Sequence, residues 1–77
     1  MKKTNIKTTT YENGDFLIDV ITTDTDYDAY IQHKDYGIKS LMFGMPKEQQ
    51  SFATFLTYVE NNLDEHIETY LEEYGED

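Results

Sequence analysis

Apolar and polar residues alternate through the first half of the chain, where β-branched residues are frequent. A period of two is typical of strands with one buried face, so this half predicts an antiparallel β-meander. We expect its four strands over about residues 4–12, 15–23, 26–33 and 38–43.

Asn13 and Gly14 predict the turn of the first hairpin. Asn-Gly is the strongest two-residue hairpin signal, because both residues tolerate the positive φ of a type I′ turn. A turn on these two residues places Tyr11 opposite Phe16.

The second hairpin is expected to turn at residues 23–26. A two-residue and a four-residue loop give the same register there, with Ile18 opposite Ile31 and Asp19 opposite Tyr30. One face of the sheet is then mainly apolar and the other mixed, as in a sheet covered on one side.

From residue 47 onward, apolar residues recur at steps of three and four, which predicts a helix. Gly44 and Pro46 are expected to end the fourth strand, and Pro46 suits the first turn of a helix. A single helix over 47–74 would run roughly 40 Å, against roughly 27 Å for an eight-residue strand.

This mismatch in length leaves two arrangements open for the second half. The chain forms either one long bent helix or two consecutive helices, about 47–61 and 62–74. Asn61 and Asn62 mark the expected bend, because Asn62 can cap a helix. The predicted fold is a single small α+β domain over residues 1–77.

Composition narrows the classes of function. The chain has no Cys and no Arg, so disulfides, cysteine nucleophiles and arginine clamps on phosphate are excluded. His33 and His66 lack the partners of a general base or a metal ligand, and there is no glycine-rich phosphate loop. No signal peptide or membrane span is expected. We therefore expect a cytoplasmic, non-enzymatic protein without a cofactor.

Charge is the strongest global feature of the sequence. Sixteen acidic residues against six lysines give a formal net charge of −10. Residues 1–59 contain all six lysines and eight of the acids, a net of −2, and residues 60–77 contain the other eight, a net of −8. Such a surface repels nucleic acid and anionic membranes and complements a basic protein surface. Solubility alone is the other explanation of the charge.

Residues 24–35, DTDYDAYIQHKD, have some of the oxygen spacing of an EF-hand calcium loop. The sixth position, where an EF-hand needs Gly, is Ala29, and the twelfth, where it needs Glu, is Asp35. The flanking segments predict strands, whereas an EF-hand loop lies between helices. A metal site at Asp24, Asp26 and Asp28 is therefore a weak alternative, and no metal is expected.

The second half of the chain contains the candidate site. Glu60, Asp64, Glu68 and Glu72 recur at steps of four, and Glu76 continues the row. Like charges at this spacing destabilise a helix, and so do acids in its last turns, which favours a role in binding. Tyrosines beside the acids can supply apolar contact area. The predicted partner-binding residues are Glu60, Asp64, Glu65, Glu68, Tyr70, Glu72, Glu73 and Tyr74.

In size, charge and order of elements, the chain resembles the small acidic proteins of phages and conjugative elements. Some proteins of that class are inhibitors that imitate DNA, among them anti-CRISPR and anti-restriction proteins. The resemblance implies a decoy that occupies a nucleic-acid-binding groove. The alternative is a small mobile-element or housekeeping domain whose charge serves solubility and whose apolar helix face self-associates, for example as a homodimer.

Overall fold

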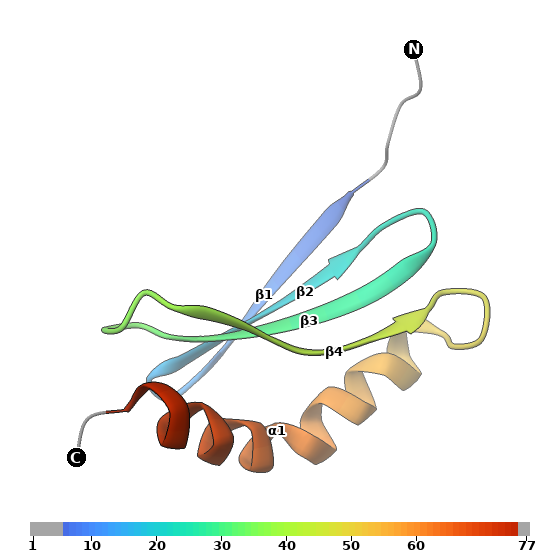
Figure 1. The fold of residues 1–77 in the computed structure, drawn as a ribbon. Coiled ribbons are helices and arrows are strands. Elements are labelled where there is room, and N and C mark those ends of the chain that lie inside the picture. The colour runs from blue at the N-terminus through green and yellow to red at the C-terminus, as the bar shows by residue number, and fades with distance from the viewer. Residues whose placement is uncertain (1–5, 76–77) are drawn as a thin grey trace.

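The computed structural model describes residues 6–75, which form an antiparallel sheet and one long helix (Figure 1). The elements are β1 (Lys7–Asn13), β2 (Phe16–Thr22), β3 (Asp26–His33), β4 (Lys39–Pro46) and α1 (Phe52–Tyr74). The strands lie in the order β1-β2-β3-β4, so each pairs with its neighbour in the chain. The predicted α+β meander is confirmed, although the part of the first predicted strand before residue 6 lies outside the described residues.

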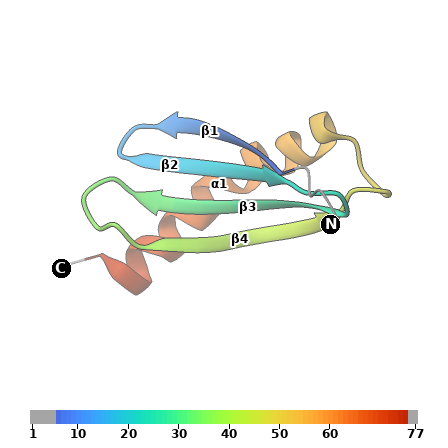
Figure 2. The same ribbon diagram turned by 90° about the horizontal axis from the view of Figure 1, so that it is seen from above.

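α1 crosses one face of the sheet diagonally, from the β1 side at its start to the β4 side at its end (Figure 2). In the part of the chain that the structure describes, no element covers the opposite face (Figure 1). The sheet therefore has an inner face, under the helix, and an outer face that is open to solvent.

The first hairpin turns one residue later than its sequence predicts. Asn13 pairs with Phe16 and Tyr11 with Ile18, so the two-residue turn consists of Gly14 and Asp15. Gly14 has φ 58°, while no other residue type in 6–75 has positive φ, which fits a type II′ turn with glycine first. The predicted Tyr11–Phe16 pair is wrong, because a type I′ turn would require positive φ at Asn13. A shift of two pairing positions still keeps the same side chains on the inner face.

The second hairpin has the predicted register, with Ile18 opposite Ile31 and Asp19 opposite Tyr30. Its turn is closed by the Thr23 N–H, which donates to the Asp26 carbonyl at 2.9 Å. The hydroxyl of Thr23 accepts the Asp26 N–H at 3.0 Å.

β4 is longer than predicted and contains a bulge. Ala29 pairs with Phe43 and Tyr30 with Leu41, so Met42 is the extra residue. Met42 is buried, and Phe43 and Met45 also pack against the core. The prediction that Gly44 and Pro46 end the strand at residue 43 is wrong. A Cβ at Gly44 would meet the Asp28 carboxylate, so glycine permits this pairing, and Pro46 is tolerated because β4 is an edge strand.

α1 begins at Phe52 rather than at residue 47. The hydroxyl of Ser51, the N-cap, accepts the Thr54 N–H at 3.1 Å. The helix then continues through Asn61 and Asn62, so the prediction of two helices is wrong and that of one long helix is confirmed. The Asn62 side chain donates to the Tyr58 carbonyl of the same helix at 2.8 Å instead of capping a new one. The helix curves over the sheet (Figure 1).

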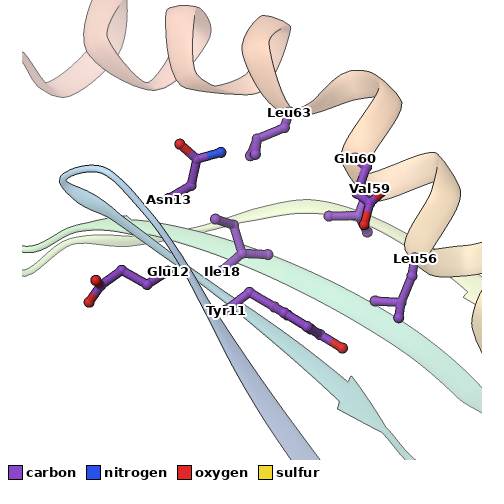
Figure 3. A pocket seen from close by; sticks show the side chains of 8 residues that line it. All are labelled: Tyr11, Glu12, Asn13, Ile18, Leu56, Val59, Glu60 and Leu63. Atoms are coloured by element: carbon purple, nitrogen blue, oxygen red, sulfur yellow. The ribbon is translucent and has the colours of Figure 1, made fainter.

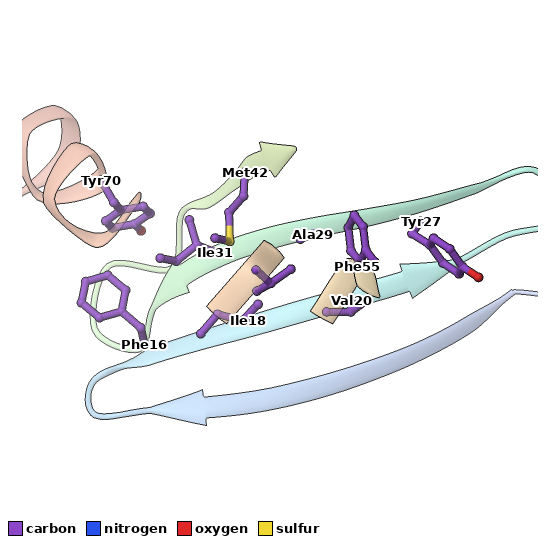
Figure 4. Packing of buried hydrophobic residues seen from close by; sticks show 10 residues of the cluster. Phe16, Ile18, Val20, Tyr27, Ala29, Ile31, Met42, Phe55 and Tyr70 are labelled. Carbon is purple, nitrogen blue, oxygen red and sulfur yellow. The ribbon is translucent and has the colours of Figure 1, made fainter. Parts of the chain in front are cut away.

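The core lies between the inner face of the sheet and one side of α1 (Figure 4). Strands and helix both contribute buried apolar side chains, namely Phe16, Ile18, Val20, Tyr27, Ala29, Ile31, Met42, Phe55, Val59 and Tyr70. The side of α1 that faces the core is therefore fixed by Phe55, Val59 and Tyr70, and the acids between them face solvent.

Candidate functional site

Six acidic residues of α1 are exposed and form what we call the acidic helix face. They are Glu60, Asp64, Glu65, Glu68, Glu72 and Glu73. Steps of four residues advance about 6 Å along the helix axis and turn about 40° around it, so the row winds slowly across the solvent side. Glu76 lies outside the described residues.

No ion pair neutralises the acidic helix face within residues 6–75. The two ion pairs of that part of the chain lie away from α1: Lys34, in the turn after β3, pairs with Glu12 of β1 at 3.0 Å, and Lys39 of β4 pairs with Asp19 of β2 at 2.7 Å. α1 contains no lysine, and its last turn has no basic residue. The helix therefore presents negative charge to solvent without an internal counter-charge.

Tyr70 is a core residue, and its prediction as an exposed contact for a partner is wrong. Its exposed fraction is 2%, its hydroxyl donates to the Ile38 carbonyl, and its ring meets Phe16 edge-on at 5.6 Å. The physical reason is its position, because it lies on the same side of the helix as Val59, three turns earlier. Tyr74 packs against Tyr70 with ring centroids 4.9 Å apart and is only partly exposed.

Burial also limits the apolar helix face that the alternative of self-association would use. Phe55, Val59 and Tyr70 are covered by the chain's own sheet. Apolar side chains that stay exposed lie on the sheet, with Leu41 at 57% and Tyr11 at 39%, and on the helix, with Tyr58 at 43% and Leu71 at 41%. Self-association of the folded chain through the helix would therefore have to use Leu71, Tyr58 or the residues that line the groove beside β1.

The two histidines pack against aromatic rings. His33 is buried, stacks on Tyr36 at 4.1 Å and accepts the Asp35 N–H through Nδ1 at 3.1 Å. His66 is partly exposed and lies 5.8 Å from the ring of Phe43.

The described residues contain no group of three or more His, Asp or Glu side chains placed to hold a metal ion. Asp24 lies in the turn after β2, and Asp26 and Asp28 lie in β3 itself, so this segment has strands where an EF-hand has helices, as predicted. The Asp26 carboxylate accepts the hydroxyl of Thr25 at 2.7 Å.

A polar group centred on Asp19 lies on the outer face of the sheet. Its carboxylate accepts Lys39 Nζ at 2.7 Å and the Thr10 hydroxyl at 2.7 Å. Burial acts to raise the pKa of Asp19, but the hydrogen bonds from Lys39 and Thr10 and the charge of Lys39 outweigh it. The net pKa is lowered from 3.8, so Asp19 is held in its charged form.

An open groove lies between the first hairpin and the middle of α1, with a volume of about 220 Å³ (Figure 3). The groove lies at the corner of the inner face that the diagonal helix leaves uncovered. Apolar side chains form most of its wall, namely Tyr11, Ile18, Leu56, Val59 and Leu63, and Glu12, Asn13 and Glu60 complete it. Sequence reasoning missed this groove because it depends on the direction in which α1 crosses the sheet.

Comparison with known proteins identifies no relative, since no protein-family model, curated protein or solved structure matches this chain. Within residues 6–75, no helix combines the length and the apolar character needed to cross a membrane. Function is therefore inferred from the surface and its charges.

Proposed function

We propose that this chain is a non-enzymatic interaction protein whose acidic helix face binds a basic protein surface. In its sharper form, the helix occupies a groove that otherwise binds nucleic acid. One observation carries the proposal: six exposed acids follow one another along α1, and none has an ion-pair partner within residues 6–75.

The linear charge density of the helix supports the sharper form. From Glu60 to Glu73 the helix rises about 20 Å, so the six carboxylates give about one negative charge per 3–4 Å. One strand of duplex DNA has a negative charge about every 3.4 Å along the axis. A groove lined with lysine and arginine would therefore meet a similar density of negative charge on α1.

The energetic cost of this arrangement also favours a role in binding. Three like-charged pairs at steps of four, from Glu60 to Glu72, each destabilise the helix by a few tenths of a kcal/mol, roughly 0.2–0.5. Glu72 and Glu73, near the C-terminus, oppose the helix dipole as well. A surface kept at the expense of stability is typical of a functional surface. The resemblance to small acidic inhibitors that imitate DNA points the same way.

Two matched double variants test the proposal. Glu68→Lys with Glu72→Lys reverses charge on the acidic helix face, and Asp24→Lys with Glu48→Lys makes the same change in net charge at two exposed loop sites. Affinity capture from cell lysate should show basic proteins bound by the original chain and by the loop variant, and lost with the helix variant or in high salt. The helix variant should also be as stable as the original, or more so by about 0.2–0.5 kcal/mol per pair.

The sharper form has its own experiment. Captured partners that bind DNA are purified and loaded with fluorescent duplex, and the chain should release the duplex in proportion to its concentration. Capture that is equal for both double variants would contradict the proposal and leave solubility as the role of the charge. Capture without release of DNA would keep the binding function and reject the imitation of nucleic acid.

A further inference from the structure

β1 is an edge strand that lacks the usual protection against pairing with another chain. It pairs with β2 over seven residues in continuous register, and its other edge has no neighbour in the described sheet. The opposite edge strand, β4, contains the Met42 bulge and Pro46, both of which hinder pairing. β1 has neither, and only Lys7 and Glu12 bring charge to it.

The register shows which main-chain groups of β1 are free. Asn13 and Phe16 close a two-residue turn, so they form a hydrogen-bonded pair. Because bonded and non-bonded pairs alternate along an antiparallel ladder, the N–H and C=O groups of Thr8, Thr10 and Glu12 point to the free edge. They offer donors and acceptors to an added strand.

The apolar groove borders this same edge. Tyr11 and Asn13 of β1 line it, and Leu56 and Leu63 of α1 lie across from them (Figure 3). Ile18, which is 2% exposed, also lines the groove. An added strand would place every second side chain on the inner face, beside Tyr11 and below the helix. A volume of about 220 Å³ is smaller than the roughly 300–1,000 Å³ of small-molecule sites and suits a single side chain.

The charge at the groove indicates what kind of segment it accepts. Glu12 is paired with Lys34, whereas Glu60 has no ion-pair partner in the described chain. Asp64 follows one turn later on α1, and no lysine lines the groove. A second copy of this chain is disfavoured as the occupant, because it would bring together two chains with a formal net charge of −10 each.

We propose that the β1 edge and the groove bind an extended basic segment of the partner by strand addition. The segment pairs with the free groups of Thr8, Thr10 and Glu12, places one apolar side chain against Tyr11 and Leu63, and directs a lysine or arginine to Glu60. Main-chain bonds supply affinity in this mode, and the groove supplies specificity. The inference rests on the proposed function for the basic character of the segment.

A synthetic peptide serves as the probe. Its sequence, Lys-Lys-Thr-Leu-Thr-Lys-Lys, has the length of β1 and puts the leucine and two lysines on one face of a strand. Titration into isotope-labelled protein, followed by NMR, should shift the amides of β1 and the methyl groups of Ile18, Leu56 and Leu63, with saturation. Replacing the leucine by serine should weaken binding about tenfold, since about 1.4 kcal/mol of apolar burial is lost.

Two substitutions at one site separate strand addition from simple charge attraction. Thr10→Pro removes a free edge N–H, and Thr10→Ala keeps it, while both lose the hydrogen bond to Asp19. Thr10→Pro should bind the peptide about tenfold more weakly than Thr10→Ala, as expected from the loss of a hydrogen bond. Equal affinities would overturn strand addition.

The variant Glu68→Lys with Glu72→Lys distinguishes this site from the acidic helix face. Shifts in β1 that persist in this variant support the proposal, because Glu60 and the groove are unchanged. Shifts confined to α1 would overturn it and still agree with the proposed function. Absence of any shift would overturn it too, and affinity capture would then decide the proposed function alone. Dimerisation without peptide, with shifts in β1, would make a second copy the occupant and also overturn it.

Discussion

Tyr70 ties the C-terminal half of α1 to the loop between β3 and β4. Its hydroxyl donates to the Ile38 carbonyl, and its ring lies among those of Phe16, Tyr36 and Tyr74. The residue combines a large buried apolar surface with a satisfied polar group, as buried tyrosines usually do.

Tyr70→Phe should lower the free energy of unfolding by about 0.5–1.5 kcal/mol, because one hydrogen bond is lost while the ring stays in place. Tyr58→Phe is the matched control, since Tyr58 is 43% exposed and its substitution should change stability by less than about 0.5 kcal/mol. Urea denaturation measures both. Equal stability of the two variants would show that the Tyr70 hydroxyl contributes nothing to folding.

Asp19, on the outer face, makes a pH-dependent contribution to the free energy of unfolding. Its folded-state pKa lies below its ordinary 3.8, so it stabilises the fold at pH values above that value. The contribution is lost as the pH falls through the lowered pKa. The difference in unfolding free energy between the original chain and Asp19→Asn should therefore be constant near neutral pH and shrink below about pH 4. A difference that is constant down to about pH 2 would contradict this assignment.

At the scale of elements, the start of α1 depends on Ser51. The segment between β4 and the helix, residues 47–51, is polar, and the Ser51 hydroxyl fixes the helix start by accepting the Thr54 N–H. The helix has no acidic residue in its first turn. The Ser51 hydroxyl is therefore the main side-chain group that stabilises the free N–H groups and the positive dipole end there.

Ser51→Ala should destabilise the chain by about 0.5–2 kcal/mol, the usual cost of losing an N-cap. Ser51→Asp restores a capping oxygen and adds a charge that suits the helix N-terminus, so it should be at least as stable as the original. Thermal or urea unfolding of the three chains gives the comparison. Loss of stability in Ser51→Asp equal to that in Ser51→Ala would argue against capping.

The sequence predicted elements whose signal is local and missed features that depend on tertiary packing. The period of two and the period near 3.6 gave the meander, the register of the second hairpin and the helix. The sequence does not decide the position of the first turn, because Asn13-Gly14 and Gly14-Asp15 both satisfy a two-residue turn and keep the same face inward. The bulge at Met42 appears only when β4 is paired with β3, since it lets Met42 and Phe43 share one face.

The same distinction between local sequence signals and tertiary packing applies to the candidate site. Exposure of the six acids followed from the helical period, because the apolar stripe fixes the opposite side. Tyr70 belongs to that stripe, and its step from Val59 was a signal that could have placed it in the core. The groove beside β1 required the crossing direction of α1, which no local pattern specifies.

At the scale of the whole molecule, charge is distributed unevenly. The ion pairs of the described chain lie within the sheet and the turn after β3, and the acidic helix face has negative charge alone. Self-repulsion should therefore act mainly between neighbouring turns of α1, where salt screens it over a Debye length of about 8–10 Å.

The melting temperature should rise between low and high sodium chloride, because screening relieves this repulsion. Chloride is preferred to sulfate, which strengthens hydrophobic burial and would mix two causes. Glu68→Lys with Glu72→Lys should show a smaller rise, since part of the repulsion has been removed. A melting temperature that is unchanged or lower in high salt would mean that the fold already compensates its acids.

Because α1 follows all four strands in the chain, the ribosome releases the complete sheet before the helix that covers it. Each strand can pair with the one made just before it, so the meander can assemble as it emerges. Until α1 arrives, its inner face, with Ile18, Val20 and Ile31, has no cover. A nascent chain that ends before Ser51 therefore exposes the apolar surface that chaperones bind. A fragment that ends before Ser51 should self-associate in sedimentation experiments, while the whole chain should not.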